Sequence, residues 1–179
     1  MQLARRRIYS GRVVNLDVDT IQYPDGSTGE LEMIRHPGAS AVLPFASDPR
    51  GTDPTVLLIR QYRYAAGGPL LEVPAGRLDP GEEPAACARR ELREEVGVTA
   101  GRVERLTTIW TTPGFTDERI HLFWAAELTA GDHAREPDEF IEVVPTPLSQ
   151  TLALVRGGEI CDGKTVAAIL YMAGFILGL

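Results

Sequence analysis

Short apolar runs, typical of β-strands, recur along the chain between segments rich in Asp, Pro and Gly. Near the N-terminus, Val14, Leu16 and Val18 alternate with polar residues, which predicts one strand that leads into a Pro-Asp-Gly turn at residues 24–26. The expected strands cover residues 8–22, 30–36, 39–45, 56–60, 70–73, 103–110, 120–128 and 141–144. Residues 147–155 and 162–177 have helical patterns, so the order of elements predicts an α/β protein.

Another short helix is expected between Pro84 and Gly97. Proline suits the first helical turn, where its missing N–H costs nothing, and glycine suits the left-handed residue just past the last turn. The apolar residues of this segment fall on one stripe at helical spacing: Ala85, Ala88, Leu92 and Val96. That face is therefore expected to pack against the rest of the protein.

The other side of this helix carries three carboxylates, Glu91, Glu94 and Glu95. Like charges one turn apart mildly destabilise an isolated helix. A hard cation such as Mg²⁺, which prefers carboxylate oxygens, would turn this repulsion into a binding site. The alternative is an ordinary solvated surface helix rich in Glu and Arg.

The helix lies inside a longer pattern, G-x5-E-x7-R-E-U-x-E-E-x-G-U, in which U is aliphatic. The pattern is filled by Gly76, Glu82, Arg90, Glu91, Leu92, Glu94, Glu95, Gly97 and Val98. With each fixed residue near ~7% background usage, seven coincide by chance on the order of 10⁻⁸ times per start position. This stretch resembles the complete Nudix box, which rules against the solvated helix.

The resemblance implies the Nudix α/β/α sandwich on a mixed β-sheet, with a small antiparallel β piece at the N-terminus. The expected division is an N-terminal segment over residues 1–36 and a hydrolase domain over residues 37–179. In similar enzymes such a segment is exchanged between two subunits, so the resemblance also implies a homodimer.

Composition narrows the class of protein further. The 179 residues fit one medium domain, and the net charge of −7 argues against a nucleic-acid-binding surface. Cys87 and Cys161 are isolated, which is typical of reduced thiols in a cytoplasmic protein. No signal peptide is visible, and the apolar run over residues 165–179 is shorter than a membrane span, so we expect a buried helix or an association face there.

The box residues are expected to hold divalent cations, by resemblance. Glu91 and Glu95 would be direct ligands, Glu94 would act through water, and Ala75 would supply a backbone carbonyl. Two or three ions are implied, with Mg²⁺ as the expected metal and Mn²⁺ or Zn²⁺ as alternatives. Glu82 would either approach the metal or pair with Arg90 to lock the loop to the helix.

The segment TTPGFTDE, residues 111–118, bears on the substrate. It resembles the ADP-ribose pyrophosphatase branch of the family, in which Glu118 would accept hydrogen bonds from the terminal ribose. The structural alternative is a simple turn between two strands.

Four further substrate contacts are implied by the resemblance. Arg63 would contact the diphosphate, although a solvated charge at a strand end is an equal alternative. Arg35 and Glu32 would contact the adenosine end, and Gly76 would let a phosphate approach the backbone.

An acidic cluster over residues 136–142 is usually a solvated loop. In the similar branch, however, a loop glutamate before the corresponding strand takes part in catalysis, and Glu139 aligns best with it.

From these resemblances together we expect Mg²⁺-dependent hydrolysis of ADP-ribose to AMP and ribose 5-phosphate. The alternatives are a Nudix enzyme that prefers FAD, NADH or GDP-mannose, and a sensor that binds ADP-ribose without cleaving it.

Overall fold

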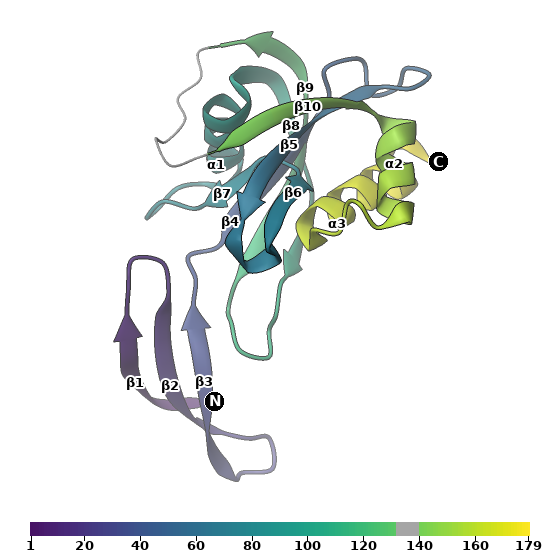
Figure 1. Ribbon diagram of the computed structural model, residues 1–179. Coiled ribbons are helices and arrows are strands. Elements are labelled where there is room, and N and C mark those ends of the chain that lie inside the picture. Colours follow the sequence, from purple (N-terminus) through teal and green to yellow (C-terminus); the bar gives the residue numbers. More distant parts are fainter. Residues whose placement is uncertain (132–139) are drawn as a thin grey trace.

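Two β-sheets form the middle layer of the protein body in the computed structural model, which describes residues 1–131 and 140–179 (Figure 1). One sheet has the order β7-β4-β9-β8 and the other has the order β10-β5-β6. Strands β4 and β9 run parallel, whereas the other neighbours are antiparallel, so the sheet is mixed as expected. The bounds are β4 Ala39–Pro44, β5 Thr55–Arg63, β6 Gly68–Glu72, β7 Ala75–Arg77, β8 Val98–Trp110, β9 Arg119–Ala130 and β10 Ile141–Pro147.

Helices cover the body on two opposite sides (Figure 1). On one side lies α1 (Pro84–Glu91), which continues into the turn η2 (Leu92–Val96) and ends at Gly97 in the left-handed conformation. On the other side lie α2 (Leu148–Gly157) and α3 (Gly163–Tyr171), followed by η3 (Met172–Leu177). A single turn, η1 (Tyr64–Ala66), joins β5 to β6. The α/β/α sandwich predicted from the sequence is confirmed.

The core has one part under each helical layer. Leu43, Leu58 and Ile169 belong to the larger cluster, and Leu92 and Phe123 belong to the cluster beneath α1. The predicted apolar stripe of α1 is correct except at its first position. Ala85 is exposed, and Cys87 is buried with Ala88 instead.

The N-terminal residues form a separate three-stranded antiparallel sheet that projects from the body (Figure 1). Its strands are β1 (Gln2–Ser10), β2 (Asn15–Gln22) and β3 (Thr28–Arg35). The expected single strand over residues 8–22 was wrong, since a tight turn closed by Gly11 N donating to Val14 O at 2.9 Å divides it. The run of three arginines in β1 hides the alternation that would have revealed the first strand.

Carboxylates, not apolar groups, are among the most buried side chains of this small sheet. Asp17 is fully buried and accepts hydrogen bonds from Arg7 and Arg35, while Asp19 accepts one from Arg35. The hydrogen bond from Arg7, opposed by burial and joined by Arg35, lowers the pKa of Asp17. The sheet is thus held by ion pairs as well as by its backbone ladder.

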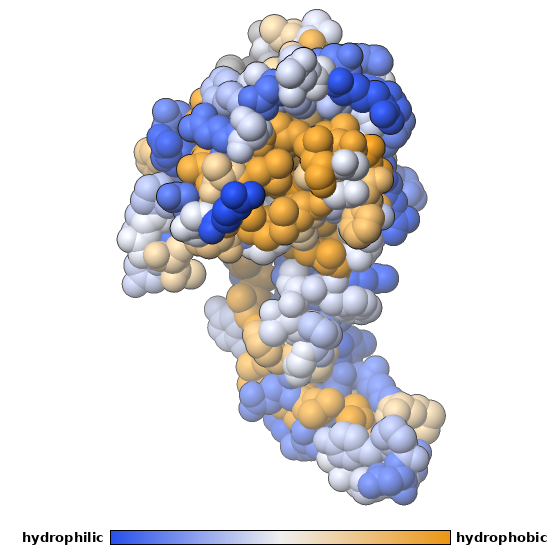
Figure 2. All heavy atoms as spheres, turned by 90° about the vertical axis from the view of Figure 1, so that its right-hand side faces the viewer, coloured by the Kyte–Doolittle hydropathy of each residue, from blue (hydrophilic) through white to orange (hydrophobic). Residues whose placement is uncertain are grey.

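The C-terminal apolar run is divided between the core and the surface. Ile169 and Met172 are buried, whereas Leu170, Phe175 and Leu179 are exposed. Figure 2 shows the broad apolar face on this side of the body. Among the described residues, no helix is both long enough and apolar enough to cross a bilayer.

Candidate active site

A cleft of about 1180 Å³ opens beside the box loop and α1. Residues 75–80 and three α1–η2 side chains line one side. The linker after β3, the facing ends of β8 and β9, Arg63 and the start of α3 line the rest. The cleft therefore gathers segments from most of the chain around the box.

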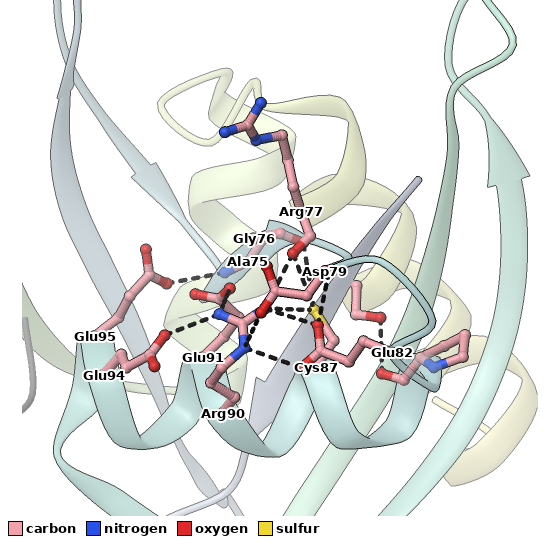
Figure 3. Close-up of polar contacts among 12 residues, drawn as sticks. Ala75, Gly76, Arg77, Asp79, Glu82, Cys87, Arg90, Glu91, Glu94 and Glu95 are labelled. Atoms are coloured by element: carbon pink, nitrogen blue, oxygen red, sulfur yellow. Dashed lines mark hydrogen bonds and ion pairs between the residues drawn. The ribbon is translucent and has the colours of Figure 1, made fainter. Parts of the chain in front are cut away.

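The backbone at Ala75 and Gly76 brings the loop against the carboxylates of the helix (Figure 3). Ala75 N donates to Glu95 Oε2 at 2.9 Å, and a Cβ on Gly76 would overlap the carboxylate of Glu91. Only glycine at this position leaves room for Glu91 as it lies. Glu91 and Glu95 are both buried, so the helix keeps these like charges away from bulk water.

The carbonyl of Ala75 points out of the β4–β7 ladder. Val42 N donates to Pro74 O, so in the alternation of an antiparallel ladder Ala41 and Ala75 form the pair without hydrogen bonds. Both polar backbone groups of Ala75 are therefore directed away from β4. The N–H reaches Glu95, and the carbonyl is available on the side of the carboxylates.

Arg90 lies at the centre of the acidic cluster (Figure 3). It donates to both oxygens of Glu82 at 2.9 Å, to Glu91 at 2.6 Å and to Glu94 at 2.9 Å. Its hydrogen bonds lower the pKa of Glu82 to about 2 despite partial desolvation. Of the two roles left open for Glu82, the structure shows the pairing with Arg90 that locks the loop to the helix.

The donor set fits a hard divalent cation. Carboxylate and carbonyl oxygens are the ligands that Mg²⁺ prefers, and Glu82, Glu91, Glu94 and Glu95 together outnumber the one guanidinium beside them. Within residues 1–131 and 140–179, no three His, Cys, Asp or Glu side chains already converge on one point as a metal site. The guanidinium of Arg90 lies between the carboxylates instead, and it partly neutralises them.

A second charged cluster, which we call the wall cluster, consists of Glu72, Arg63 and Lys164 and borders the cleft. Glu72 is 1% exposed and receives a bidentate pair from Arg63 at 2.8 and 2.9 Å. Lys164 Nζ donates to the same carboxylate at 2.5 Å and to Asp162 at 3.0 Å. Burial alone would raise the pKa of Glu72, but the two cations outweigh it and the pKa is lowered, so Glu72 is charged at neutral pH.

Glu118 lines the same cleft as Arg63 and Lys164 of the wall cluster. Ile109 in β8 and its partner Ile120 in β9 line the cleft with it, as do Trp110 and Thr111. Thr111 Oγ1 donates to Glu118 Oε2 at 2.9 Å, and His36 Nε2 is 3.5 Å from Glu118 Oε1. The carboxylate is thus held on the cleft by two neighbours.

A model of the NUDIX domain family matches residues 35–167, which contain the box loop, α1 and the lining of the cleft. The chain belongs to the Nudix hydrolase family. It is 39% identical over 172 residues to an ADP-ribose pyrophosphatase from Bacillus subtilis (strain 168), which covers 95% of this chain and 90% of that protein.

Two other relatives carry different names. The chain is 38% identical over 168 residues to a methanol dehydrogenase activator from Bacillus methanolicus, covering 93% of this chain and 88% of that protein. It is 43% identical over 128 residues to a GDP-mannose pyrophosphatase from Citrobacter koseri, covering 66% of each. The crystal structure of an ADP compounds hydrolase superposes with a TM-score of 0.83 over 99% of this chain and 94% of that one, at 22% identity, which shows the shared Nudix fold.

The structure places the predicted Nudix site residues in two groups. Ala75, Gly76, Arg63, Glu91, Glu94 and Glu118 line the cleft, and Glu95 is bonded to its lining. Arg35 and Glu32 belong to the N-terminal sheet, where Arg35 pairs with Asp17, Asp19 and Asp117 and Glu32 is exposed. A contact between these two residues and the adenosine end remains a prediction.

Glu139, the expected catalytic glutamate, lies outside the described residues, as do Glu136 and Asp138. Glu142 is described, and it pairs across the strands with Arg60 at 2.7 Å. Glu142 therefore has a structural partner on β5, while Glu139 stays a prediction.

Sequence reasoning missed Glu72, Lys164 and His36 as residues of the Nudix cleft. Glu72 lies only three positions before Ala75, in the run LEVPAG, and a charged residue inside an apolar strand was the available signal. Lys164 follows the helix-capping Asp162, but nothing in its spacing links it to the box.

Proposed function

We propose that this Nudix hydrolase cleaves ADP-ribose with water to give AMP and ribose 5-phosphate. The observation that carries the proposal is that Glu118 lies on the same cleft as the box carboxylates and the wall cluster. A diphosphate that carries a sugar needs metal-binding carboxylates, cations for its phosphates and an acceptor for the sugar hydroxyls, and this one cleft holds all three. The similarity to an ADP-ribose pyrophosphatase over nearly the whole chain supports it.

We assign the box residues to metal binding. Glu91 and Glu95 are the proposed direct ligands, Glu94 the ligand through water, and the Ala75 carbonyl the backbone ligand. Bound divalent ions, with Mg²⁺ expected, would neutralise the diphosphate and lower the pKa of a bound water. Arg90 holds Glu91 and Glu94 in place from the side of the helix.

The remaining groups of the cleft orient the substrate. Arg63 and Lys164, anchored on Glu72, donate to phosphate oxygens in our proposal, and Gly76 leaves the backbone open to the diphosphate. Glu118 accepts hydrogen bonds from ribose hydroxyls. A carboxylate built to read hydroxyls discriminates strongly, because a substrate without them leaves it unpaired.

The N-terminal sheet has a proposed role between subunits. Residues 1–36 would form one unit and residues 37–179 the catalytic domain, which agrees with a family match that begins at residue 35. In a homodimer, Arg35 and Glu32 of this sheet would approach the adenosine end of the partner's substrate. Sedimentation velocity at micromolar concentration should give twice the chain mass, and a fully active monomer would contradict the shared site.

GDP-mannose is the second candidate substrate. The 43% identity to a GDP-mannose pyrophosphatase over 128 residues favours it, although that match covers less of the chain than the ADP-ribose pyrophosphatase does. A sugar with hydroxyls beside Glu118 is common to both candidates.

A substrate panel tests the proposal. ADP-ribose, GDP-mannose, FAD and NADH are incubated separately with the enzyme and Mg²⁺, and the products are resolved by ion-exchange chromatography. We expect the highest kcat/KM for ADP-ribose, with AMP and ribose 5-phosphate in equal amounts. A higher kcat/KM for GDP-mannose would transfer the assignment to the second candidate, and tight ADP-ribose binding without products would indicate a sensor.

A further inference from the structure

The 111–118 loop is joined to the end of β3, the last strand of the N-terminal sheet. Ile34 N donates to Phe115 O at 2.8 Å, and Asp117 N donates back to Ile34 O at 3.3 Å. This short bridge pairs the end of β3 with the loop that carries Glu118. The position of the loop therefore depends on β3 as well as on its own turn.

Asp117 adds the side-chain part of this junction. One oxygen accepts from the backbone N of His36 at 2.8 Å, and the other accepts from Arg35 Nη1 at 3.2 Å. Arg35 also donates to Asp17 and Asp19 in β2. The ion-pair network of the N-terminal sheet thus extends through one guanidinium to Asp117.

Glu118, the next residue, receives contacts from the same junction. His36, whose backbone is held by Asp117, approaches Glu118 with its ring at 3.5 Å, and Glu118 N donates to Thr116 Oγ1 at 3.2 Å. Asp117 and Glu118 are neighbours, so a shift of one moves the other. The two carboxylates nevertheless have different surroundings, since Glu118 lines the cleft and Asp117 faces the linker.

We propose that Asp117 is a positioning residue, which fixes Glu118 in the cleft by tying the 111–118 loop to Arg35 and to the backbone of His36. The sugar-recognising end of the cleft and the N-terminal sheet are then set together. This inference rests on the proposed role of Glu118 in reading sugar hydroxyls. It adds a residue that contacts no substrate and yet determines how tightly the sugar end is held.

A double-mutant cycle on Asp117 and Glu118 tests the inference. Asp117→Asn keeps the size and one acceptor oxygen but removes the charge that faces Arg35. We expect it to raise KM for ADP-ribose about tenfold while kcat changes less than about twofold. In the Glu118→Gln background the same substitution should raise KM less than about twofold, because its effect acts through Glu118.

Inhibition by the two products distinguishes a change at the sugar end of the cleft from a general loss of structure. Asp117→Asn should weaken inhibition by ribose 5-phosphate about as much as it raises KM. It should leave inhibition by AMP unchanged, because Asp17 and Asp19 still hold Arg35 in the N-terminal sheet. If inhibition by both products weakens equally, the inference is overturned, since this result would indicate a disturbance of the whole cleft.

Two further variants serve as controls. Asp53→Asn removes a carboxylate that accepts from Ser149 N at 2.9 Å and from Ser149 Oγ at 2.7 Å, away from the cleft, and it should leave KM unchanged. Asp117→Glu restores the charge and should keep KM within about threefold of the wild-type value, which also covers the case in which Asp117→Asn folds poorly.

The failures are distinguishable. If Glu118→Gln alone leaves KM unchanged, the proposed role of Glu118 is wrong. If Asp117→Asn raises KM equally in both backgrounds, the positioning role is wrong even though Glu118 binds the sugar. If GDP-mannose is the better substrate, the cycle is measured on GDP-mannose with the same expectations.

Discussion

The cleft contains two charged clusters built with opposite polarity. In the box cluster, one guanidinium, that of Arg90, is surrounded by the carboxylates of Glu82, Glu91 and Glu94. In the wall cluster, one buried carboxylate, that of Glu72, is surrounded by the cations of Arg63 and Lys164. The box cluster presents carboxylates to the cleft. The wall cluster presents the cations of Arg63 and Lys164, of which Lys164 also pairs with Asp162 at 3.0 Å.

This difference indicates what each cluster is suited to bind. The box cluster keeps negative charge that its own arginine does not neutralise, and a divalent cation would complete it. The wall cluster presents cations whose geometry is fixed by a buried anchor, which suits phosphate oxygens. A negatively charged enzyme that handles a negatively charged substrate needs both, since neither cluster alone brings the diphosphate to the carboxylates.

Removal of a box ligand should have the largest effect. Glu91→Gln keeps the shape of the side chain but removes the charge proposed to hold the metal, so we expect kcat to fall about 10³-fold at saturating Mg²⁺. The matched control is Glu104→Gln, which removes an exposed carboxylate paired with Arg102 and should change kcat less than twofold. Rates for Glu91→Gln near those of the control would show that the box cluster is only structural.

Gly76 tests the box cluster through the backbone. A methyl group at this position would overlap the carboxylate of Glu91, which is the flexible end of a side chain and would move aside. We therefore expect Gly76→Ala to lower kcat about 10²-fold and to have little effect on the free energy of unfolding. Gly174→Ala, where no heavy atom lies within 4 Å of the new methyl, is the control and should keep full activity. If both variants are equally active, Glu91 does not depend on the close approach at Gly76.

A substitution in the wall cluster should lower activity less than the box substitutions do, and it should lower the free energy of unfolding more. Glu72→Gln leaves Arg63 and Lys164 without their shared anion, and breaking a buried pair by removing one partner costs ~3–5 kcal/mol. The partial exposure of Arg63 places the expected loss near the lower end, at about 3 kcal/mol in urea unfolding. We also expect KM to rise about tenfold. An unchanged KM would separate the wall cluster from substrate binding.

Much of the fold was predictable because most of its strands and helices are bounded by turn residues and have clear patterns. The N-terminal antiparallel sheet was expected, but its first strand was not, since Arg5, Arg6 and Arg7 interrupt the alternation of β1 and the buried positions of the sheet hold carboxylates. Alternation of apolar residues detects an apolar interior, and this sheet has a charged one.

The two clusters differ just as much in what the sequence reveals. The box cluster lies within one loop and one helix, so a fixed spacing identifies it. The wall cluster joins residues 63, 72 and 164 from two strands and a distant helix, and no spacing connects them. The ion pairs of Arg35 were missed for the same reason, because its partners Asp17, Asp19 and Asp117 meet it only in the folded chain.

The smallest expected effect concerns acid stability. The pKa of Glu82 is about 2 in the folded protein and 4.5 for an unperturbed carboxyl, because Arg90 favours the charged form. Its contribution is therefore fully present above about pH 5 and is lost as the pH falls toward 2. The difference in unfolding free energy between wild type and Glu82→Gln should shrink over this range. A difference that stays constant from pH 6 to pH 2 would contradict the ion pair.

A direct measurement of metal binding tests whether the box cluster, and not the wall cluster, binds the metal. Mn²⁺ is titrated into the wild type and the Glu91→Gln, Glu95→Gln and Glu72→Gln variants with AMP present, and free Mn²⁺ is followed by electron paramagnetic resonance. We predict that the wild type and Glu72→Gln bind Mn²⁺, and that Glu91→Gln and Glu95→Gln lose most of this binding. Equal Mn²⁺ binding by all four proteins would contradict the assignment of the box cluster as the metal site.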